Sequence, residues 1–211
     1  MFADRTEAGL RLAEQLVPLE PWLDTVVLGI PRGGVVVAAE VARVLGLPLG
    51  IVATAKVSSP SSPEFAIGAV SADGRVYPNA ASGHSAEEVE SSADAARQKV
   101  ARTVTELEAD REPAPVAGKA VLLVDDGLAT GLTALAAVDY LRRAGAALVV
   151  LAAPVASRSA VELLKPSVDR IVVVDVPVEF RAVGEFYERF GQTQDAEVVA
   201  LLKEADKRTA T

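Results

Sequence analysis

Val121-Leu-Leu-Val-Asp-Asp-Gly-Leu-Ala-Thr-Gly-Leu-Thr133 is the stretch that indicates the fold most directly. It starts with four apolar residues, which are typical of a buried strand, and continues with two adjacent acids, Asp125 and Asp126. A short segment with two glycines then leads into a helical pattern from Leu132 to Arg143. A strand, a tight loop and a helix in this order form the repeating unit of parallel sheets.

The same alternation extends on both sides of this stretch. Around it we predict strands at Ala120–Val124, Leu148–Val155 and Arg170–Val176, with a helix at Ser157–Lys165. Before it we predict a helix at Asp4–Val17, a strand at Thr25–Ile30, a helix at Val36–Leu45 and a strand at Leu49–Ala55. Because the strands are apolar throughout, both faces of the sheet should be covered. The predicted fold class is therefore α/β, a parallel twisted sheet with helices on both faces.

A single domain over residues 1–211 is expected, with two additions to the sheet. Residues of about 56–117 are predicted to form an insertion, with a short strand at Ala66–Ser71, a mobile loop at Tyr77–Ser85 and a long helix at Ala86–Arg111. Residues of about 177–193 hold four of the nine aromatic residues and are expected to fold back over the strand ends. An alternative is that these rings only cap the core.

Composition narrows the classes of function. The net charge of −8 argues against broad binding to nucleic-acid phosphates. There is neither a long apolar run nor a signal-like start, so a cytoplasmic protein without a membrane partner is expected. The absence of cysteine excludes disulfides and thiolate chemistry. The only histidine, His84, lies in the expected loop, which argues against a catalytic triad or a histidine-based metal site and favours solvent exposure of the ring.

The loop after Val124 combines an anion-binding segment with a pair of acids. Ligands of open parallel sheets bind at the carboxyl ends of the strands, and the N–H groups at the beginning of a helix favour a phosphate there. The candidate phosphate-binding residues are Gly127, Ala129, Thr130, Gly131, Leu132 and Thr133. Asp125 and Asp126 could accept hydrogen bonds from sugar hydroxyls, although capping of the helix by Asp126 or Thr130 is an alternative. A Walker loop is excluded because Leu132, not lysine, precedes Thr133.

Pro31-Arg32-Gly33-Gly34 follows the first expected strand and is a second candidate anion site. The two glycines permit unusual backbone angles, and the guanidinium of Arg32 suits diphosphate oxygens. Lys56, at the end of the next strand, would add a cation. The alternatives are a simple tight turn for the glycines and a solvated surface position for Lys56.

These residues resemble the type I phosphoribosyltransferase family, and within it a bacterial group of phosphoribosyltransferase-domain proteins. The resemblance lies in Gly29–Val35, Pro63–Val70, Val121–Thr133, Ala182–Gly184 and Phe190–Thr193. It implies that Asp125 and Asp126 hold the ribose hydroxyls, that Ala129 to Thr133 hold the 5′-phosphate, and that Arg32, Gly33, Gly34 and Lys56 bind pyrophosphate. It also implies that a mobile segment that covers the reacting centre begins at Lys56, and that residues 177–193 form a hood that selects the acceptor.

The function expected from this resemblance is Mg²⁺-dependent transfer of a 5-phosphoribosyl group between 5-phosphoribosyl-1-pyrophosphate (PRPP) and a nitrogenous base. Asp125, Asp126, Lys56 and Arg32 would be catalytic, and Mg²⁺ would arrive with PRPP, with Asp125 as the candidate protein ligand. The alternatives are a nucleotide phosphorylase or hydrolase that uses the same pocket, and a non-catalytic sensor of PRPP or nucleotides. The expected partners are small molecules alone, and exposed apolar patches on the inserted helix would support a homodimer.

Overall fold

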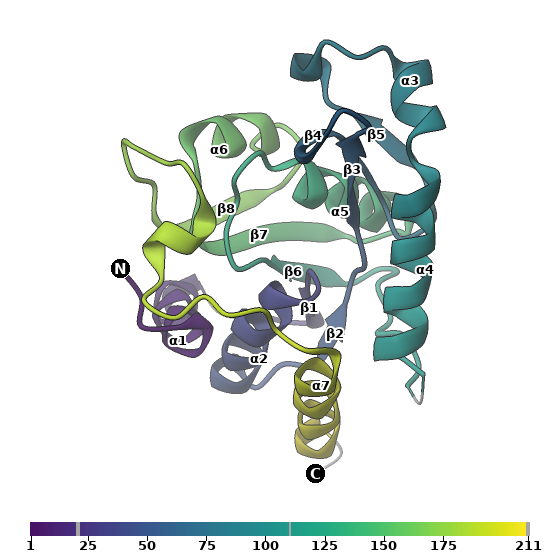
Figure 1. Cartoon of the computed structure of the whole chain (residues 1–211). Helices are drawn as coiled ribbons and strands as arrows, with labels where there is room; N and C mark the ends of the chain where they lie inside the picture. Colours follow the sequence, from purple (N-terminus) through teal and green to yellow (C-terminus); the bar gives the residue numbers. More distant parts are fainter. Residues whose placement is uncertain (20–21, 110, 210–211) are drawn as a thin grey trace.

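A five-stranded parallel sheet forms the centre of the protein, with the strand order β2-β1-β6-β7-β8 (Figure 1). The computed structural model describes residues 1–19, 22–109 and 111–209. The strands are β1 (Thr25–Gly29), β2 (Leu49–Ile51), β6 (Ala120–Val124), β7 (Leu148–Val155) and β8 (Arg170–Asp175). Neighbouring strands are parallel throughout, so the predicted α/β class with a parallel sheet is confirmed.

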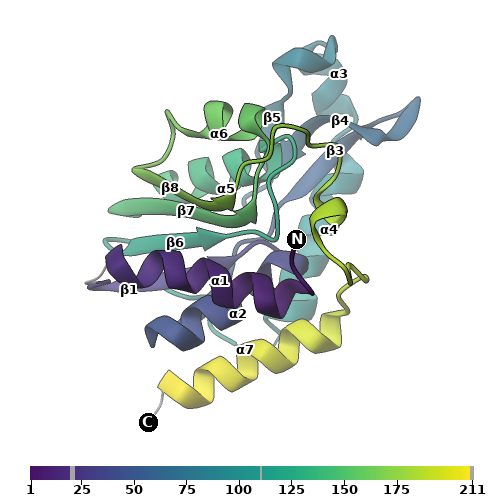
Figure 2. The same cartoon turned by 90° about the vertical axis from the view of Figure 1, so that its left-hand side faces the viewer.

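Helices cover both faces of this sheet, as the apolar strands predicted (Figure 2). One face carries α1 (Arg5–Leu16), α2 (Gly33–Leu45) and α7 (Asp195–Thr209), and the other carries α5 (Leu132–Arg143) and α6 (Arg158–Leu164). Along β6, Leu122 and Val124 pack into the first layer, whereas Val121 and Leu123 pack into the second. This alternation is the period of two that a strand imposes on its side chains.

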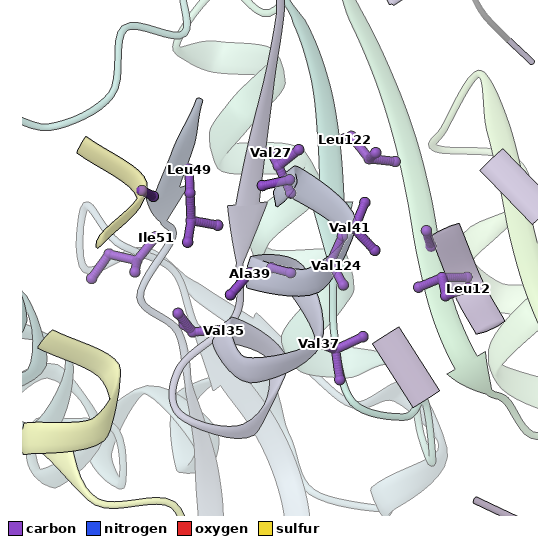
Figure 3. Close-up of a cluster of buried hydrophobic side chains, with 14 of the residues drawn as sticks. Leu12, Val27, Val35, Val37, Ala39, Val41, Leu49, Ile51, Leu122 and Val124 are labelled. Atoms are coloured by element: carbon purple, nitrogen blue, oxygen red, sulfur yellow. The ribbon is translucent and has the colours of Figure 1, made fainter. Parts of the chain in front are cut away.

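Helix α2 is buried on nearly every side because its sequence is apolar apart from Glu40 and Arg43. Figure 3 shows its apolar side chains between the sheet and α1; the labelled residues include Val35, Val37, Ala39 and Val41 of α2, Val27, Leu122 and Val124 of the sheet, and Leu12 of α1. Each fully buried aliphatic side chain contributes about 1.5–3 kcal/mol to folding. The start of α2, at Gly33, is therefore held firmly against the sheet.

A second, antiparallel sheet lies beside the first and contains β3 (Ala55–Ser59), β4 (Ser62–Val70) and β5 (Val76–Pro78). One face packs against α3 (Ala86–Ser91) and α4 (Asp94–Leu107), and the other packs against α5. The strand expected at Leu49–Ala55 is thus divided, because β2 joins the parallel sheet and β3 joins the antiparallel one. The strand expected at Ala66–Ser71 is present but starts earlier, at Ser62.

The single long helix predicted over Ala86–Arg111 is wrong, because the segment forms two helices, α3 and α4. The hydroxyls of Ser91 and Ser92 both donate to the Glu88 carbonyl at 2.9 Å. Serine hydroxyls that bond to a carbonyl of the preceding turn compete with the helical ladder and bend it. Both helices keep their apolar residues on the small sheet, including Val89 and Val100.

The proposed apolar surface for a homodimer is also absent from α3 and α4. Their large apolar side chains pack against the small sheet, and none of the exposed large hydrophobic residues among those described belongs to residues 86–107. The homodimer stays a prediction, but the apolar surface from which it was predicted is not exposed on these two helices. No helix within the described ranges is long and apolar enough to cross a membrane.

The aromatic segment after β8 folds back over the strand ends, as expected. It contains a short 3-10 helix, η3 (Val183–Phe186). Two other 3-10 helices lie elsewhere in the chain, η1 (Val17–Leu19) after α1 and η2 (Ala80–Ser82) after β5. Tyr187 is buried beside Phe2, with 5.4 Å between the ring centroids, and packs in a cluster that includes Val155 at the end of β7. The chain then passes through residues 188–194 to α7. The sequence analysis did not predict this last helix.

Candidate active site

The anion-binding segment begins where β6 ends and is held by the neighbouring strand. Leu128 bridges to Ala156, and its N–H donates to the Val155 carbonyl at 2.9 Å. The Ser157 hydroxyl donates to the carbonyl of Ala129 at 2.6 Å. Ala129 itself is exposed. The end of β7 and the start of α6 therefore hold one side of the loop, and its other side faces solvent.

Helix α5 begins at this loop without a side-chain cap. Its N-cap residue is Gly131, whose φ of 77° lies in the left-handed region that favours glycine. Thr130 contributes only a long contact of 3.4 Å from the Leu132 N–H to its hydroxyl, and Asp126 does not reach the helix start as a cap. The capping alternative is thus not what the structure shows. The uncapped N–H groups and the helix dipole make this end suited to a phosphate.

The Arg32-Gly33-Gly34 loop lies directly against the acidic pair, so the two sequence motifs form one site. A Cβ atom added to Gly33 would lie 2.0 Å from Asp126 Oδ2, and one added to Gly34 would lie 2.9 Å from Asp125 Oδ1. No side chain larger than hydrogen fits at either position without displacement. The peptide bond between Pro31 and Arg32 is cis.

Asp126 has a cationic partner that the sequence analysis missed. Arg5 Nε donates to Asp126 Oδ2 at 2.7 Å, and the exposed fractions of the two side chains are 13% and 17%. The same guanidinium donates to the carbonyl of Gly191 at 2.8 Å and lies 3.9 Å from the centroid of the Phe190 ring. Arg5 therefore connects the acidic pair to the C-terminal segment.

The two carboxylates have different surroundings. Burial raises the pKa of Asp125 well above its ordinary value, the negative charge of Asp126 raises it further, and the Asp126 N–H and Arg5 oppose both effects. Burial also raises the pKa of Asp126, but its hydrogen bond and ion pair with Arg5 act in the opposite direction. Asp125 Oδ1 accepts the N–H of Asp126 at 2.9 Å. Among the described residues, Asp126 is thus the carboxylate of the pair with a cationic partner, and Asp125 has none.

Arg32 is held by an aspartate from the C-terminal helix. Its Nη2 donates to Asp195 Oδ2 at 2.9 Å, and its Nε donates to Asp195 Oδ1. Both side chains are partly exposed, at 35% and 39%. An incoming anion would have to compete with Asp195 for this guanidinium.

A cavity of about 210 Å³ opens beside this loop. Its lining residues come from the first helix, the Pro31 loop, the segment before β3, α4 and the C-terminal segment: Arg5, Pro31, Arg32, Gly33, Thr54, Lys99, Thr103, Gln192 and Thr193. It therefore adjoins the acidic pair through Arg5 and Gly33.

Lys56, which was expected to bind pyrophosphate together with Arg32, does not line the cavity beside Arg32. In the small sheet it pairs with Ala69, and side chains of paired residues lie on the same face. Ala69 packs against Leu132, so Lys56 lies on the face that is turned to the beginning of α5. His84 is half-buried in a turn, with Nδ1 3.1 Å from the carbonyl oxygen of Ser82. It does not line the cavity beside Arg32.

The C-terminal segment closes the other side of the acidic pair. The Tyr187 hydroxyl donates to the carbonyl of Asp126 at 2.6 Å. A Cβ atom on Gly127 would lie 2.4 Å from Val183 Cγ1, so η3 presses on the first residues of the anion-binding loop. Burial raises the pKa of Tyr187, which keeps its hydroxyl protonated as a donor.

Comparisons with known proteins show the family to which the chain belongs. The sequence model of the phosphoribosyl transferase domain matches residues 6–185. Two curated proteins from strains of Mycobacterium tuberculosis, named "Putative phosphoribosyl transferase MT0597" and "Putative phosphoribosyl transferase Rv0571c", are each 38% identical to the chain over 211 residues. The match covers 98% of this chain and 47% of each relative, so the chain spans about half the length of these proteins.

Two solved structures extend the comparison. TT1426 from Thermus thermophilus is 42% identical, with a TM-score of 0.80 over 96% of this chain and 98% of that chain. The AQ2163 protein from Aquifex aeolicus is 15% identical, with a TM-score of 0.50 over 82% of this chain and 72% of that chain, a likeness of fold alone. The domain match over residues 6–185 shows that the chain belongs to the phosphoribosyl transferase domain family.

Proposed function

We propose that this chain binds PRPP and transfers its 5-phosphoribosyl group to a nitrogenous base, with release of pyrophosphate. The observation that carries the proposal is the contact between Gly33 and Asp126, which joins the Arg32 loop, the acidic pair and the anion-binding loop into one continuous surface. A ligand with a phosphate, vicinal hydroxyls and a diphosphate would use all three parts.

The 5′-phosphate is proposed to bind Ala129 to Thr133. Exposed N–H groups at the start of α5 supply donors, and Gly131 lets the backbone approach the ligand closely. Lys56 faces this end of the helix and would add a positive charge on the side of the small sheet.

The ribose hydroxyls are proposed to bind the acidic pair, chiefly Asp125. Asp126 already accepts a hydrogen bond from Arg5, whereas the one hydrogen bond that Asp125 accepts within the described chain comes from the neighbouring N–H. An ionised carboxylate offers about four acceptor sites, so Asp125 retains capacity for hydroxyl donors. Each such charge-assisted hydrogen bond is worth roughly 1.5–3 kcal/mol.

In the proposed transfer, the bond between C1′ and the pyrophosphate oxygen breaks and a bond from C1′ to the acceptor nitrogen forms. Pyrophosphate leaves with the electron pair of the broken bond, and the acceptor nitrogen loses its proton. The chain would contribute orientation of the ribose, positive charge from Arg32 towards the leaving group, and exclusion of water. No covalent nucleophile is needed for such a displacement.

Mg²⁺ is proposed to enter the site with the ligand, which would carry most of its coordination. The described residues contain no cluster of three or more acidic or histidine side chains that could hold a metal ion. Magnesium is commonly held by one or two carboxylates together with substrate phosphates, and Asp125 is the carboxylate here without a cationic side-chain partner in the described chain. When bound, the ion would screen the charge of pyrophosphate.

The acceptor is proposed to bind beneath residues 177–193, which form the hood. This segment meets the acidic pair through Tyr187 and the anion-binding loop through Val183. The residues from about 58 to 85 are proposed to close over the reacting centre. No nucleic-acid partner belongs to the proposal, in keeping with the net charge of −8.

Isotope exchange between labelled pyrophosphate and PRPP, with Mg²⁺ and a panel of nitrogenous bases, tests the proposal. Exchange that requires a base supports transfer. Release of ribose 5-phosphate from a nucleotide by water alone would indicate a hydrolase, and release of the base from a nucleotide that requires inorganic phosphate would indicate a phosphorylase. Binding of PRPP in calorimetry without any turnover would indicate a sensor, and absence of PRPP binding would refute the shared pocket.

A further inference from the structure

The cavity beside Arg32 has a lining that suits an anion with several oxygens. Its volume is about 210 Å³, and its lining contains three cationic side chains, four side chains with hydroxyl or amide groups, and none with a carboxylate. This contrasts with the chain as a whole, in which acidic residues outnumber basic ones by 29 to 21. The lining of this cavity is therefore basic although the chain as a whole is acidic.

The three cations of the lining differ in their partners. Arg5 pairs with Asp126, and Arg32 pairs with Asp195. Lys99, on α4, makes neither an ion pair nor a hydrogen bond with any residue that the structure describes. Its ammonium is thus the one cation of the lining, among described residues, whose charge no protein carboxylate offsets.

Two hydroxyl side chains accompany Lys99. Thr103 follows it by one helical turn on α4, and residues four apart lie on the same face of a helix. Thr54 lines the cavity from the segment before β3, and its Oγ1 is buried without a hydrogen-bond partner in the described part of the chain. Buried polar atoms are nearly always paired, so an unpaired hydroxyl beside a cationic cavity marks a position for a ligand oxygen or water.

We propose that Lys99, together with Thr103 and Thr54, completes a diphosphate-binding subsite and contacts the pyrophosphate group of PRPP. Figure 2 shows α4 beside the segment that leads into α7, and both line the cavity. The inserted helix is then part of the active site and not only a cover for the small sheet. This inference rests on the proposed function.

In this proposal, two lysines contact different ends of the ligand. Lys99 and Arg32 line the same cavity, whereas Lys56 lies on the α5 side of the small sheet. Lys99 thus serves the diphosphate end of the ligand, and Lys56 serves the 5′-phosphate end.

Calorimetric titration with Mg²⁺-pyrophosphate, PRPP and ribose 5-phosphate tests the subsite in Lys99→Ala and Lys99→Arg. Lys99→Ala should weaken binding of pyrophosphate and PRPP roughly tenfold, as expected for loss of one charge-assisted contact, and should leave ribose 5-phosphate within about twofold. Lys99→Arg should retain most of the affinity. Arg102→Ala removes a charge from an exposed position on the same helix that does not line the cavity, and should leave all three ligands within about twofold.

Wild-type affinity for pyrophosphate in Lys99→Ala overturns the inference, and so does an equal loss for all three ligands or a loss that Arg102→Ala reproduces. In these cases the wild-type protein still binds PRPP, and the proposed function stands. A wild-type protein that binds neither PRPP nor pyrophosphate overturns the proposed function and, with it, this subsite.

Discussion

Asp126→Asn removes the carboxylate charge that pairs with Arg5, and the matched variant Asp125→Asn removes the adjacent charge, which has no such partner. Both substitutions keep the shape of the side chain and an oxygen that accepts hydrogen bonds. A difference between the two variants therefore reports on the surroundings of each charge. At neutral pH we expect Asp126→Asn to lower the free energy of unfolding and Asp125→Asn to raise it.

The size of the loss in Asp126→Asn follows from the burial of the ion pair. Breaking a fully buried pair costs about 3–5 kcal/mol, and an exposed pair contributes roughly 0–1 kcal/mol. The pair of Arg5 and Asp126 lies near the buried limit, with side chains 13% and 17% exposed and 2.7 Å between Nε and Oδ2. Because the amide oxygen still accepts from Nε, we expect a loss of about 2 kcal/mol, which lowers Tm by roughly 4–8 °C in a chain of this size.

The opposite result for Asp125→Asn follows from its lack of a cationic partner among the described residues: burial raises the pKa of both carboxyls, but only Asp126 has a hydrogen bond and ion pair with Arg5 that strongly oppose the rise. Burial raises the pKa of Asp125 above the ordinary value of 3.8, so the folded state binds more protons than the unfolded state between these two pKa values. The ionised carboxylate consequently costs stability above this window, and the cost disappears as the pH falls through it. Asparagine avoids that cost at neutral pH and still accepts the N–H of Asp126.

Urea denaturation at neutral pH and at about pH 4, followed by calorimetry with PRPP, measures both effects. Asp125→Asn should gain stability relative to the wild type at the higher pH only, and should bind PRPP about tenfold to a hundredfold more weakly. An Asp126→Asn variant as stable as Asp125→Asn would refute the role of Arg5. Unchanged PRPP affinity in both variants would refute the assignment of the acidic pair.

Three further substitutions test the loops around the pair. Gly33→Ala places a Cβ atom 2.0 Å from Asp126 Oδ2 and should cost about 1–3 kcal/mol in urea denaturation; wild-type stability would contradict the close approach. Gly131→Ala forces a side chain onto a φ of 77°, so we expect a loss of about 1 kcal/mol and weaker calorimetric binding of ribose 5-phosphate, and unchanged binding would count against the phosphate loop. Asp195→Asn releases Arg32 and should raise pyrophosphate affinity severalfold; a lower affinity would show that Asp195 orients the guanidinium instead.

The parts of the fold that the sequence predicted depend on local patterns. The strand at Ala120–Val124 and the helix at Leu132–Arg143 were predicted at their observed limits, because four apolar residues, a glycine-containing loop and a helical period follow one another without interruption. The acids and glycines between them are adjacent in sequence, so their proximity in space needed no tertiary information. The roles of these residues stay predictions.

The parts that the sequence analysis missed depend on contacts between distant segments. Arg5 and Asp126 are 121 residues apart, and Arg32 and Asp195 are 163 residues apart. Such pairings cannot be deduced from local spacing. One signal was nevertheless present, because a cation at the first residue of a helix is unfavourable to the helix dipole, and an anionic partner for Arg5 at the start of α1 offsets this effect.

Helix α7 shows a pattern that was readable but was not used. Val198, Leu202 and Ala205 recur at helical spacing and are buried against α2 and the sheet. Placing this helix against α2 would have brought its first residue, Asp195, near the start of α2 and hence near Arg32. The missing step was tertiary, because the sequence does not indicate which of the two sheet faces α7 covers.

The short segment from Tyr187 to Asp195 contacts three parts of the candidate site, namely the backbone of Asp126, Arg5 and Arg32. Tyr187 donates to the Asp126 carbonyl, Gly191 accepts from Arg5, and Asp195 pairs with Arg32. A diphosphate that takes Arg32 from Asp195 therefore removes one of the attachments at the end of this segment, while the contacts to the acidic pair persist. Under the proposed function, this segment continues from the hood, so binding of PRPP at the proposed pyrophosphate end is expected to change the freedom of the proposed acceptor end before any base arrives. We therefore expect PRPP to be the first ligand to bind, since a base that entered first would meet a segment still held by all three contacts.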